Sequence, residues 1–401
     1  MNKIILVLVP LLIVSLHSMG YASSSSRFCA RMKIESNGNQ LDTLSCKPAG
    51  REWMREIEEF QDYAVPAVIT TGSTIDARVL ILSPKWSGAY DISSKTIINE
   101  LRSRGLGVEF TLFNYQGDTQ QAKIIIENAE TNGIDLIISM GSATTAFLSE
   151  FYAGGNLPVV TSCSKDPVSM NLIDPTVGMS QNNIAYTSLN ISVSTQVSYL
   201  KEKFLTDLHH IAVIFDRNNP SSILTQVKPL ERYLANSDVD IELDMIEVDF
   251  DRIDETLYEP MQRFSDNSST TRDRVFLVTG STELFNVIEN INYYANDVPV
   301  LSVTPSHVMA NSNSVFMAIG VSFKTNAKLA ADYAYRIITH QSDPQTLPVG
   351  LVSTPDIAIN FQRKPPGDLK VPFKFFEDAF FIFNHDGVAV REDGKSISRG
   401  Q

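Results

Sequence analysis

The segment at 134–168 holds the residue types and spacing that best suit ligand binding. An isoleucine-rich run at 134–139 predicts a buried strand, and a helix is expected to start on Gly141, Ser142, Ala143 and Thr144. The first N–H groups of a helix lack partners within the helix, and the helix dipole is positive there, so such a start attracts carboxylates and phosphates. The alternative is an ordinary strand-to-helix turn that binds nothing.

Patterns typical of catalysis and nucleotide binding are missing from the sequence. The loop at 139–144 has neither the GxGxxG spacing nor the GxxxxGK[ST] pattern, and the chain has no GxSxG elbow. The neighbouring His209 and His210 cannot share one face of a strand or helix, and the later histidines lack metal-ligand spacing. We therefore expect a protein that is not an enzyme and that needs no metal or cofactor.

The first 22 residues have the pattern of a secretory signal peptide. Lys3 precedes an apolar run at 4–16, and Gly20 and Ala22 suit a cleavage site. No later segment approaches the roughly 18 consecutive apolar residues of a membrane span. We expect an exported, periplasmic protein.

The charge balance disfavours nucleic acid as a partner. The chain has 46 acidic against 33 basic residues, a formal net charge of −13. Nucleic acids and anionic membranes are bound mainly through basic patches. We therefore expect no nucleic acid partner.

Three cysteines in an exported chain allow one disulfide and one spare thiol. Cys29 and Cys46 lie in a polar stretch ahead of the main fold and form the expected pair, which would contribute about 3 kcal/mol on the chain-entropy model. Cys163 follows an apolar strand pattern, and we interpret it as a small buried residue.

Strand and helix patterns alternate along the chain and predict an α/β fold with two doubly wound, parallel-sheet lobes. The first series has strands at 79–83, 108–114 and 134–139, with helices at 92–104 and 119–132. The second has strands at 211–215, 241–248 and 275–278, with helices at 193–204, 224–235 and 258–264.

Three segments carry a resemblance to a known family. They are 135–141, where Asp-Leu-Ile-Ile leads into the glycine; 157–168, where Leu-Pro-Val-Val leads into Asp-Pro-Val; and 318–349, where Ala-Ile-Gly-Val-Ser-Phe enters a helix before Leu-Pro-Val. Their order resembles ABC-transporter substrate-binding proteins of the type I periplasmic-binding-protein fold, in the branch that includes aromatic-amino-acid binders. The resemblance covers about residues 76–375.

The resemblance implies two lobes, three crossovers that make a hinge, and a solute held in the cleft. Beyond the signal peptide at 1–22, we expect an extension at 23–75, lobe one at 76–186 plus 303–352, and lobe two at 187–302 plus 353–401. Within the extension, residues 51–63 predict an amphipathic helix that packs on lobe one or docks a partner.

Two departures from the family pattern concern the ligand. The turn at 279–282 lacks the usual acidic residue, and the loop at 86–91 lacks the usual histidine. An acidic residue in such clefts commonly pairs with a ligand amine. Its absence puts an α-amino acid in doubt and leaves an anionic or neutral solute open.

Ligand-binding residues are expected at the carboxyl ends of strands, where open α/β sheets bind ligands. Besides Gly141, Ser142, Ala143 and Thr144, these ends carry the residues Trp86, Ser87, Tyr90, Ser164, Asp166, Asn218, Ser281, Thr282, Thr304 and Ser306. Trp86 and Tyr90 suit stacking on the solute or hinge packing equally. Asp166 is better explained as a turn residue before a proline, since its side chain can accept backbone N–H groups.

The sequence thus predicts an extracytoplasmic solute-binding protein that closes over a small polar molecule, such as an amino acid, and delivers it to a membrane permease. The alternative is a periplasmic sensory subunit whose liganded form docks on a membrane receptor or kinase.

Overall fold

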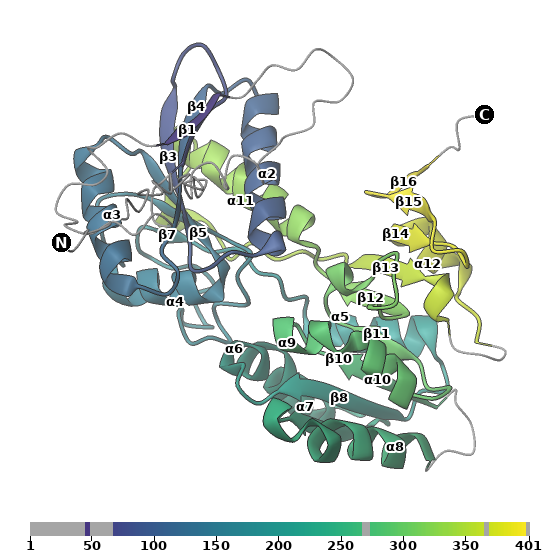
Figure 1. Cartoon of the computed structure of the whole chain (residues 1–401). Helices are drawn as coiled ribbons and strands as arrows, with labels where there is room; N and C mark the ends of the chain where they lie inside the picture. The colour runs from purple at the N-terminus through teal and green to yellow at the C-terminus, as the bar shows by residue number, and fades with distance from the viewer. Residues whose placement is uncertain (1–44, 49–66, 267–272, 365–368, 398–401) are drawn as a thin grey trace, which may run out of the picture.

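The computed structural model of the chain describes residues 45–48, 67–266, 273–364 and 369–397. Within them the chain forms two α/β lobes, each built on its own sheet (Figure 1). The lobe with the seven-stranded sheet is called lobe one below, and the lobe with the nine-stranded sheet is lobe two. The expected signal peptide, Cys29 and the amphipathic helix at 51–63 lie outside the described residues, and the predicted disulfide stays a prediction.

The sheet of lobe one is parallel except at one edge. In order across the sheet, its strands are β1 (Ser45–Pro48), β2 (Ala67–Thr70), β4 (Val108–Asn114), β3 (Ala77–Ser83), β5 (Leu136–Met140), β6 (Val159–Ser162) and β7 (Ile184–Ala185). Only β2 runs against its neighbours, β1 and β4. The start of the described chain therefore adds two strands to lobe one from within the expected extension at 23–75.

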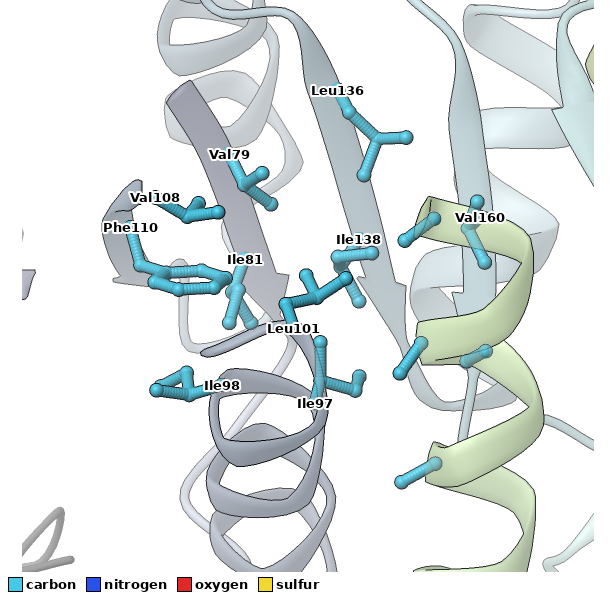
Figure 2. Packing of buried hydrophobic residues seen from close by; sticks show 14 of the residues in the cluster. Val79, Ile81, Ile97, Ile98, Leu101, Val108, Phe110, Leu136, Ile138 and Val160 are labelled. Carbon is cyan, nitrogen blue, oxygen red and sulfur yellow. The ribbon is translucent and has the colours of Figure 1, made fainter. Parts of the chain in front are cut away.

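Helices cover both faces of this sheet, which explains why the central strands β3 and β5 are mainly apolar. Val79 and Ile81 of β3 point to the face covered by α2 (Gly88–Ser103) and α11 (Phe323–Ile338), as Figure 2 shows for the packed core. Leu80 and Leu82 point to the face covered by α3 (Thr119–Thr131) and α4 (Gly141–Phe151). Successive strand residues alternate between the two cores.

Polar side chains fix where these helices begin. Asp118 accepts hydrogen bonds from the Gln120 and Gln121 N–H groups at the start of α3. Ser322 does the same for the Thr325 N–H of α11. These caps satisfy N–H groups that have no partner within the helix, and each contributes about 1 kcal/mol.

The sheet of lobe two has a parallel centre and a mixed C-terminal edge. In order, its strands are β9 (Glu242–Val248), β8 (His210–Asp216), β10 (Arg274–Val278), β11 (Val300–Ser302), β12 (Met317–Gly320), β13 (Asp356–Asn360), β14 (Ala379–Phe383), β15 (Ala389–Glu392) and β16 (Lys395–Ser396). The strands from β9 to β12 are parallel, and β13 is antiparallel to β12. The two-lobed α/β fold expected from the sequence is confirmed, with antiparallel strands added at sheet edges.

Lobe two also has a core on each side of its sheet. One core takes residues from α5 (Val193–Val197), α7 (Lys228–Asn236) and α12 (Phe373–Asp378). The other takes residues from α8 (Glu259–Asp266), α9 (Thr282–Asn286) and α10 (Ile288–Tyr294), and the short α6 (Pro220–Ser222) follows β8. No helix in the described residues is long and apolar enough to cross a membrane.

The described chain passes between the lobes at 186–192, 321–322 and 347–355. One boundary differs from the expected division, because residues 303–320 were expected in lobe one and β12 lies in the lobe two sheet. The return to lobe one comes after Gly320, where a Cβ would lie 1.9 Å from the Val303 carbonyl oxygen. Only glycine fits where the chain leaves the sheet so close to its neighbour.

Asn326 of α11 ties the crossovers to lobe one. Its Oδ1 accepts the Cys163 N–H at 2.7 Å, and its Nδ2 donates to Thr187 Oγ1 at 3.1 Å. Asn326 is fully buried. The first and third crossovers are joined directly, since the Gly350 N–H donates to the Tyr186 carbonyl at 2.8 Å and the Ser188 N–H donates to the Gly350 carbonyl at 2.9 Å.

Replacing this buried amide should destabilise the protein strongly. In Asn326→Leu the buried Cys163 N–H loses its acceptor, so we expect the free energy of unfolding to fall by about 2–4 kcal/mol. The matched control is Asn236→Leu, because Asn236 is exposed and donates to the Arg232 carbonyl within its own helix. Urea denaturation should show a loss below about 0.5 kcal/mol for the control. Equal losses would mean that the Asn326 contacts do not hold the crossovers.

Candidate functional site

Lobe one supplies its first site residues from the loop between β3 and α2. Ser87 caps α2 by accepting the Ala89 N–H at 3.3 Å. Trp86 and Tyr90 pack against the lobe one core. Burial raises the pKa of the Tyr90 hydroxyl far above its usual range, so this group stays protonated. Ser87 therefore has a structural role, and Trp86 and Tyr90 both pack on lobe one beside it.

The start of α4 lies against Tyr90. Gly141 has a φ of +81°, and a Cβ there would lie 2.2 Å from the Tyr90 hydroxyl oxygen. Thr144 is buried and shares a 3.1 Å hydrogen bond with the Tyr115 hydroxyl, whereas Ala143 is exposed. The structure therefore brings Tyr90 and Gly141, two of the predicted site residues, into contact, and it gives Thr144 an internal partner.

The turn after β6 contains Cys163, Ser164 and Lys165, and these side chains have different surroundings. Cys163 is buried with a φ of +58°, and burial raises its pKa to about 12, so the thiol is unreactive. Ser164 is buried. Lys165 donates its backbone N–H to Ser142 Oγ at 3.0 Å, which holds this turn against the start of α4.

Asp166 has the turn role that the sequence favoured. Its Oδ2 accepts the Ser169 N–H at 2.9 Å and the Ser169 hydroxyl at 2.6 Å. Its own N–H donates to Asn190 Oδ1 at 2.8 Å. These bonds fix the loop that leads from lobe one toward the first crossover, and they occupy one of the two carboxylate oxygens.

Lobe two presents three strand ends to the same region. After β10, Ser281 is buried and donates to Asp216 Oδ2 at 3.0 Å. Asn218 is exposed and donates its backbone N–H to Asp216 Oδ1 at 2.9 Å. After β11, Thr304 lies beside Gly280, since a Cβ on the glycine would be 3.0 Å from Thr304 Oγ1. Ser306 is partly buried, and the side chain of Thr282 lies outside what the structure describes.

Lys165 joins these two walls across the lobes. Its Nζ donates to Ser222 Oγ and, at 3.1 Å, to the Gly280 carbonyl. Ser222 donates to the same carbonyl at 2.7 Å. Burial lowers the pKa of the Lys165 ammonium to about 7, and the negative charge of Asp216 opposes this shift only in part.

A buried histidine lies close enough to Lys165 to feel its charge. His307 Nδ1 shares a 2.8 Å hydrogen bond with Ser302 Oγ, and its ring stacks on Phe285. Burial, and secondarily the positive charge of Lys165, lowers the pKa of His307 to about 4. The ring is therefore neutral at physiological pH.

Lys165, Ser222, Gly280 and His307 were not among the predicted site residues. The rule that selected Ser164 and Asp166 also covers the lysine between them, so the sequence did hold a signal for Lys165. Nothing in the sequence indicates that Ser222 and Gly280 accept hydrogen bonds from the Lys165 ammonium, because these bonds join separate lobes.

Two cavities lie beside the site without including the predicted residues. A groove of about 650 Å³ is lined by Val168, Ser169, residues 171–175 and Arg232 of α7. A cavity of about 20 Å³ lies beside the first crossover, between residues 189–196 and Gln226, whose Oε1 accepts the Gly280 N–H at 2.9 Å. We place the site at the strand ends because polar groups from both lobes converge there on Lys165. The described residues contain no group of three His, Cys, Asp or Glu that could hold a metal ion.

Gly141→Ala tests the contact between α4 and Tyr90. The new Cβ must displace the Tyr90 ring, and the alanine must also keep the positive φ of this position. We therefore expect a loss of about 2–4 kcal/mol in the free energy of unfolding. Gly154→Ala is the control, because Gly154 has a φ of +82° with open space around it. Urea denaturation should show only the backbone cost of about 1–2 kcal/mol there. Equal losses in the two variants would rule out the tyrosine contact.

The lowered pKa of Lys165 predicts a pH dependence of stability. The unfolded chain holds the lysine proton up to about pH 10.5, whereas the folded chain releases it near pH 7. Between these values the unfolded state binds more protons, so Lys165 destabilises the fold at pH 7 and below, and this penalty disappears as pH rises. Relative to Lys165→Met, the wild type should gain stability from pH 6.5 to 9.5 in urea denaturation. A constant difference between the two proteins would show that the ammonium is solvated.

Comparison with known proteins gives the same architecture. A family model described as ABC transporter substrate binding protein matches residues 88–365. No curated protein sequence matches the chain at a significant level.

Three solved structures are similar in fold. A conserved domain protein from Vibrio cholerae has a TM-score of 0.55 at 19% identity, covering 76% of this chain and 98% of its own. A ligand-free, open substrate binding protein with adhesive properties from Clostridium difficile has a TM-score of 0.57 at 16% identity, covering 72% and 93%. A Streptococcus pneumoniae ABC domain in complex with L-Trp has a TM-score of 0.56 at 16% identity, covering 76% and 99%.

The family model spans most of both lobes and runs past β13 of lobe two. The solved structures share the two-lobed periplasmic-binding-protein fold that the sequence led us to expect. This chain belongs to the ABC transporter substrate binding protein family.

Proposed function

We propose that the protein binds a small solute between its lobes outside the cytoplasm and delivers it to a membrane permease. The observation that carries this proposal is the convergence of polar strand ends from both lobes on Lys165. Such a site has polar groups that can orient a small solute. Export depends on the signal peptide that the sequence predicts at 1–22.

Hinge closure is the conformational part of the proposal. The lobes are connected by short crossovers that lie side by side, as the Gly350 and Tyr186 hydrogen bond indicates. Rotation about such a hinge separates or joins the two site walls without disturbing either core. A solute that contacts both walls stabilises the closed form, and a permease can recognise that form by its altered surface.

Two of the similar structures support the proposal that the two lobes hold a solute. The Clostridium difficile protein is described as ligand-free and open, and the Streptococcus pneumoniae domain as a complex with L-Trp. An amino acid or a related small polar molecule is therefore a reasonable first solute class for this chain. Sequence identity of 16% does not transfer the solute itself.

The proposal is tested with mature, ligand-stripped protein. We would measure melting temperature against amino acids, nucleosides, small carboxylates, phosphates and sugars, and then measure the radius of gyration with each hit by small-angle X-ray scattering. A ligand at about 100 times its dissociation constant adds about 2.7 kcal/mol of stability. We expect one chemical class of hits and a smaller radius of gyration with them.

Two results would contradict the proposal. A flat screen over all classes would favour a role without a small solute, such as docking on a receptor. A solute that raises the melting temperature but leaves the scattering curve unchanged would show that binding does not close the lobes. Lys328→Met serves as the control variant, because Lys328 is exposed on α11 and its loss should not change the hits.

A further inference from the structure

The Lys165 ammonium is held between the lobes by neutral groups alone. Its two acceptors are the Ser222 hydroxyl and the Gly280 carbonyl, both in lobe two. Within the described residues, no carboxylate lies within ion-pair distance of its Nζ. A cation placed between protein surfaces without a contacting anion is costly, and proteins usually pair such a charge.

The acidic group whose charge acts on Lys165 is already occupied. Asp216 accepts the Ser281 hydroxyl on one oxygen and the Asn218 N–H on the other. Its charge acts on Lys165 only at longer range and does not offset the cost of burial, which leaves the lysine pKa near 7. His307 cannot supply a negative charge, and its ring is bonded to Ser302.

The position of Lys165 also suits recognition at closure. Its backbone is fixed in lobe one through Ser142 at the start of α4, and its ammonium reaches lobe two. A solute group bound to this ammonium would contact both walls at once. The positive end of the α4 dipole adds attraction for negative charge on the lobe one side.

We infer that the solute carries a carboxylate, and that this carboxylate binds the Lys165 ammonium between the two lobes. The inference rests on the proposed function and narrows its solute class. A single lysine ammonium is a compact point charge, and one carboxylate group neutralises it with its own single negative charge. The solute carboxylate takes the place of the neutral acceptors that now hold the ammonium.

A rival role for Lys165 predicts the opposite effect of mutation. If the lysine only latches the lobes together around a neutral solute, its bonds to Ser222 and Gly280 compete with the solute. Removing the ammonium would then leave affinity unchanged or increase it. If it binds the solute carboxylate, removal leaves a desolvated anion unpaired and affinity falls.

The experiment compares each carboxylate in the screening panel with its primary amide, by melting temperature and then by isothermal titration calorimetry. The wild type, Lys165→Met, Lys165→Arg and the control Lys328→Met are measured side by side. We expect hits among the carboxylates and not their amides, and a loss of about 100-fold in affinity for Lys165→Met. Lys165→Arg should retain part of the affinity because the charge remains.

The pH profile gives an independent readout. Above pH 7 the free wild-type protein loses its Lys165 proton, so affinity for a carboxylate should fall by up to about tenfold per pH unit between 7.5 and 8.5. Lys165→Arg keeps its charge and should show no such fall. A merely structural role of the lysine would not give this difference between the two proteins.

Each other outcome has one meaning. Amides that bind as well as their carboxylates, or Lys165→Met with wild-type or higher affinity, overturn the inference while the proposed solute-binding function stands. A panel with no hit for any variant overturns the proposed function and the inference with it. Circular dichroism and urea denaturation of Lys165→Met confirm that a lost affinity is not a loss of folding.

Discussion

Asn326 joins the end of β6, the first crossover and α11 through hydrogen bonds that have no access to water. The helix that carries it comes late in the chain, after most of lobe two has been built, yet it covers one face of the lobe one sheet. Lobe one is therefore incomplete until the chain returns to it. The buried amide decides where that return is anchored, because any other register would leave the Cys163 N–H without an acceptor.

The position of the site follows from this constraint. The anchored α11 places the turn after β6, and that turn places Lys165 between α4 and lobe two. The close packing of Tyr90 on Gly141 fixes the neighbouring wall, where no side chain larger than hydrogen fits. Both lobes thus present strand ends that their own packing holds in place, and the crossovers connect the two lobes behind them.

Much of the fold was accessible from the sequence because its signals are local. Isoleucine-rich runs such as 134–139 predict strands covered on both faces, and glycine at 141 marks the turn into α4. The boundary at 303 was less accessible. Residues 317–320 are a short apolar strand, and its pairing with β11 and β13 assigns it to lobe two. The two strands before residue 76, β1 and β2, were not predicted either, because each is only four residues long.

The sequence by itself determined the alternation of strands and helices, the polar character of the strand ends, and the turn role of Asp166 before its proline. Periodicity and turn chemistry depend on neighbours in the chain, so one sequence is enough to read them. The tertiary structure alone decided that Thr144 and Ser281 use their hydroxyl groups in internal bonds, to Tyr115 and Asp216. It alone also brought the Lys165 ammonium to Gly280, 115 residues further along the chain. Contacts of that kind depend on how two separately folded sheets meet, and no local pattern encodes that meeting.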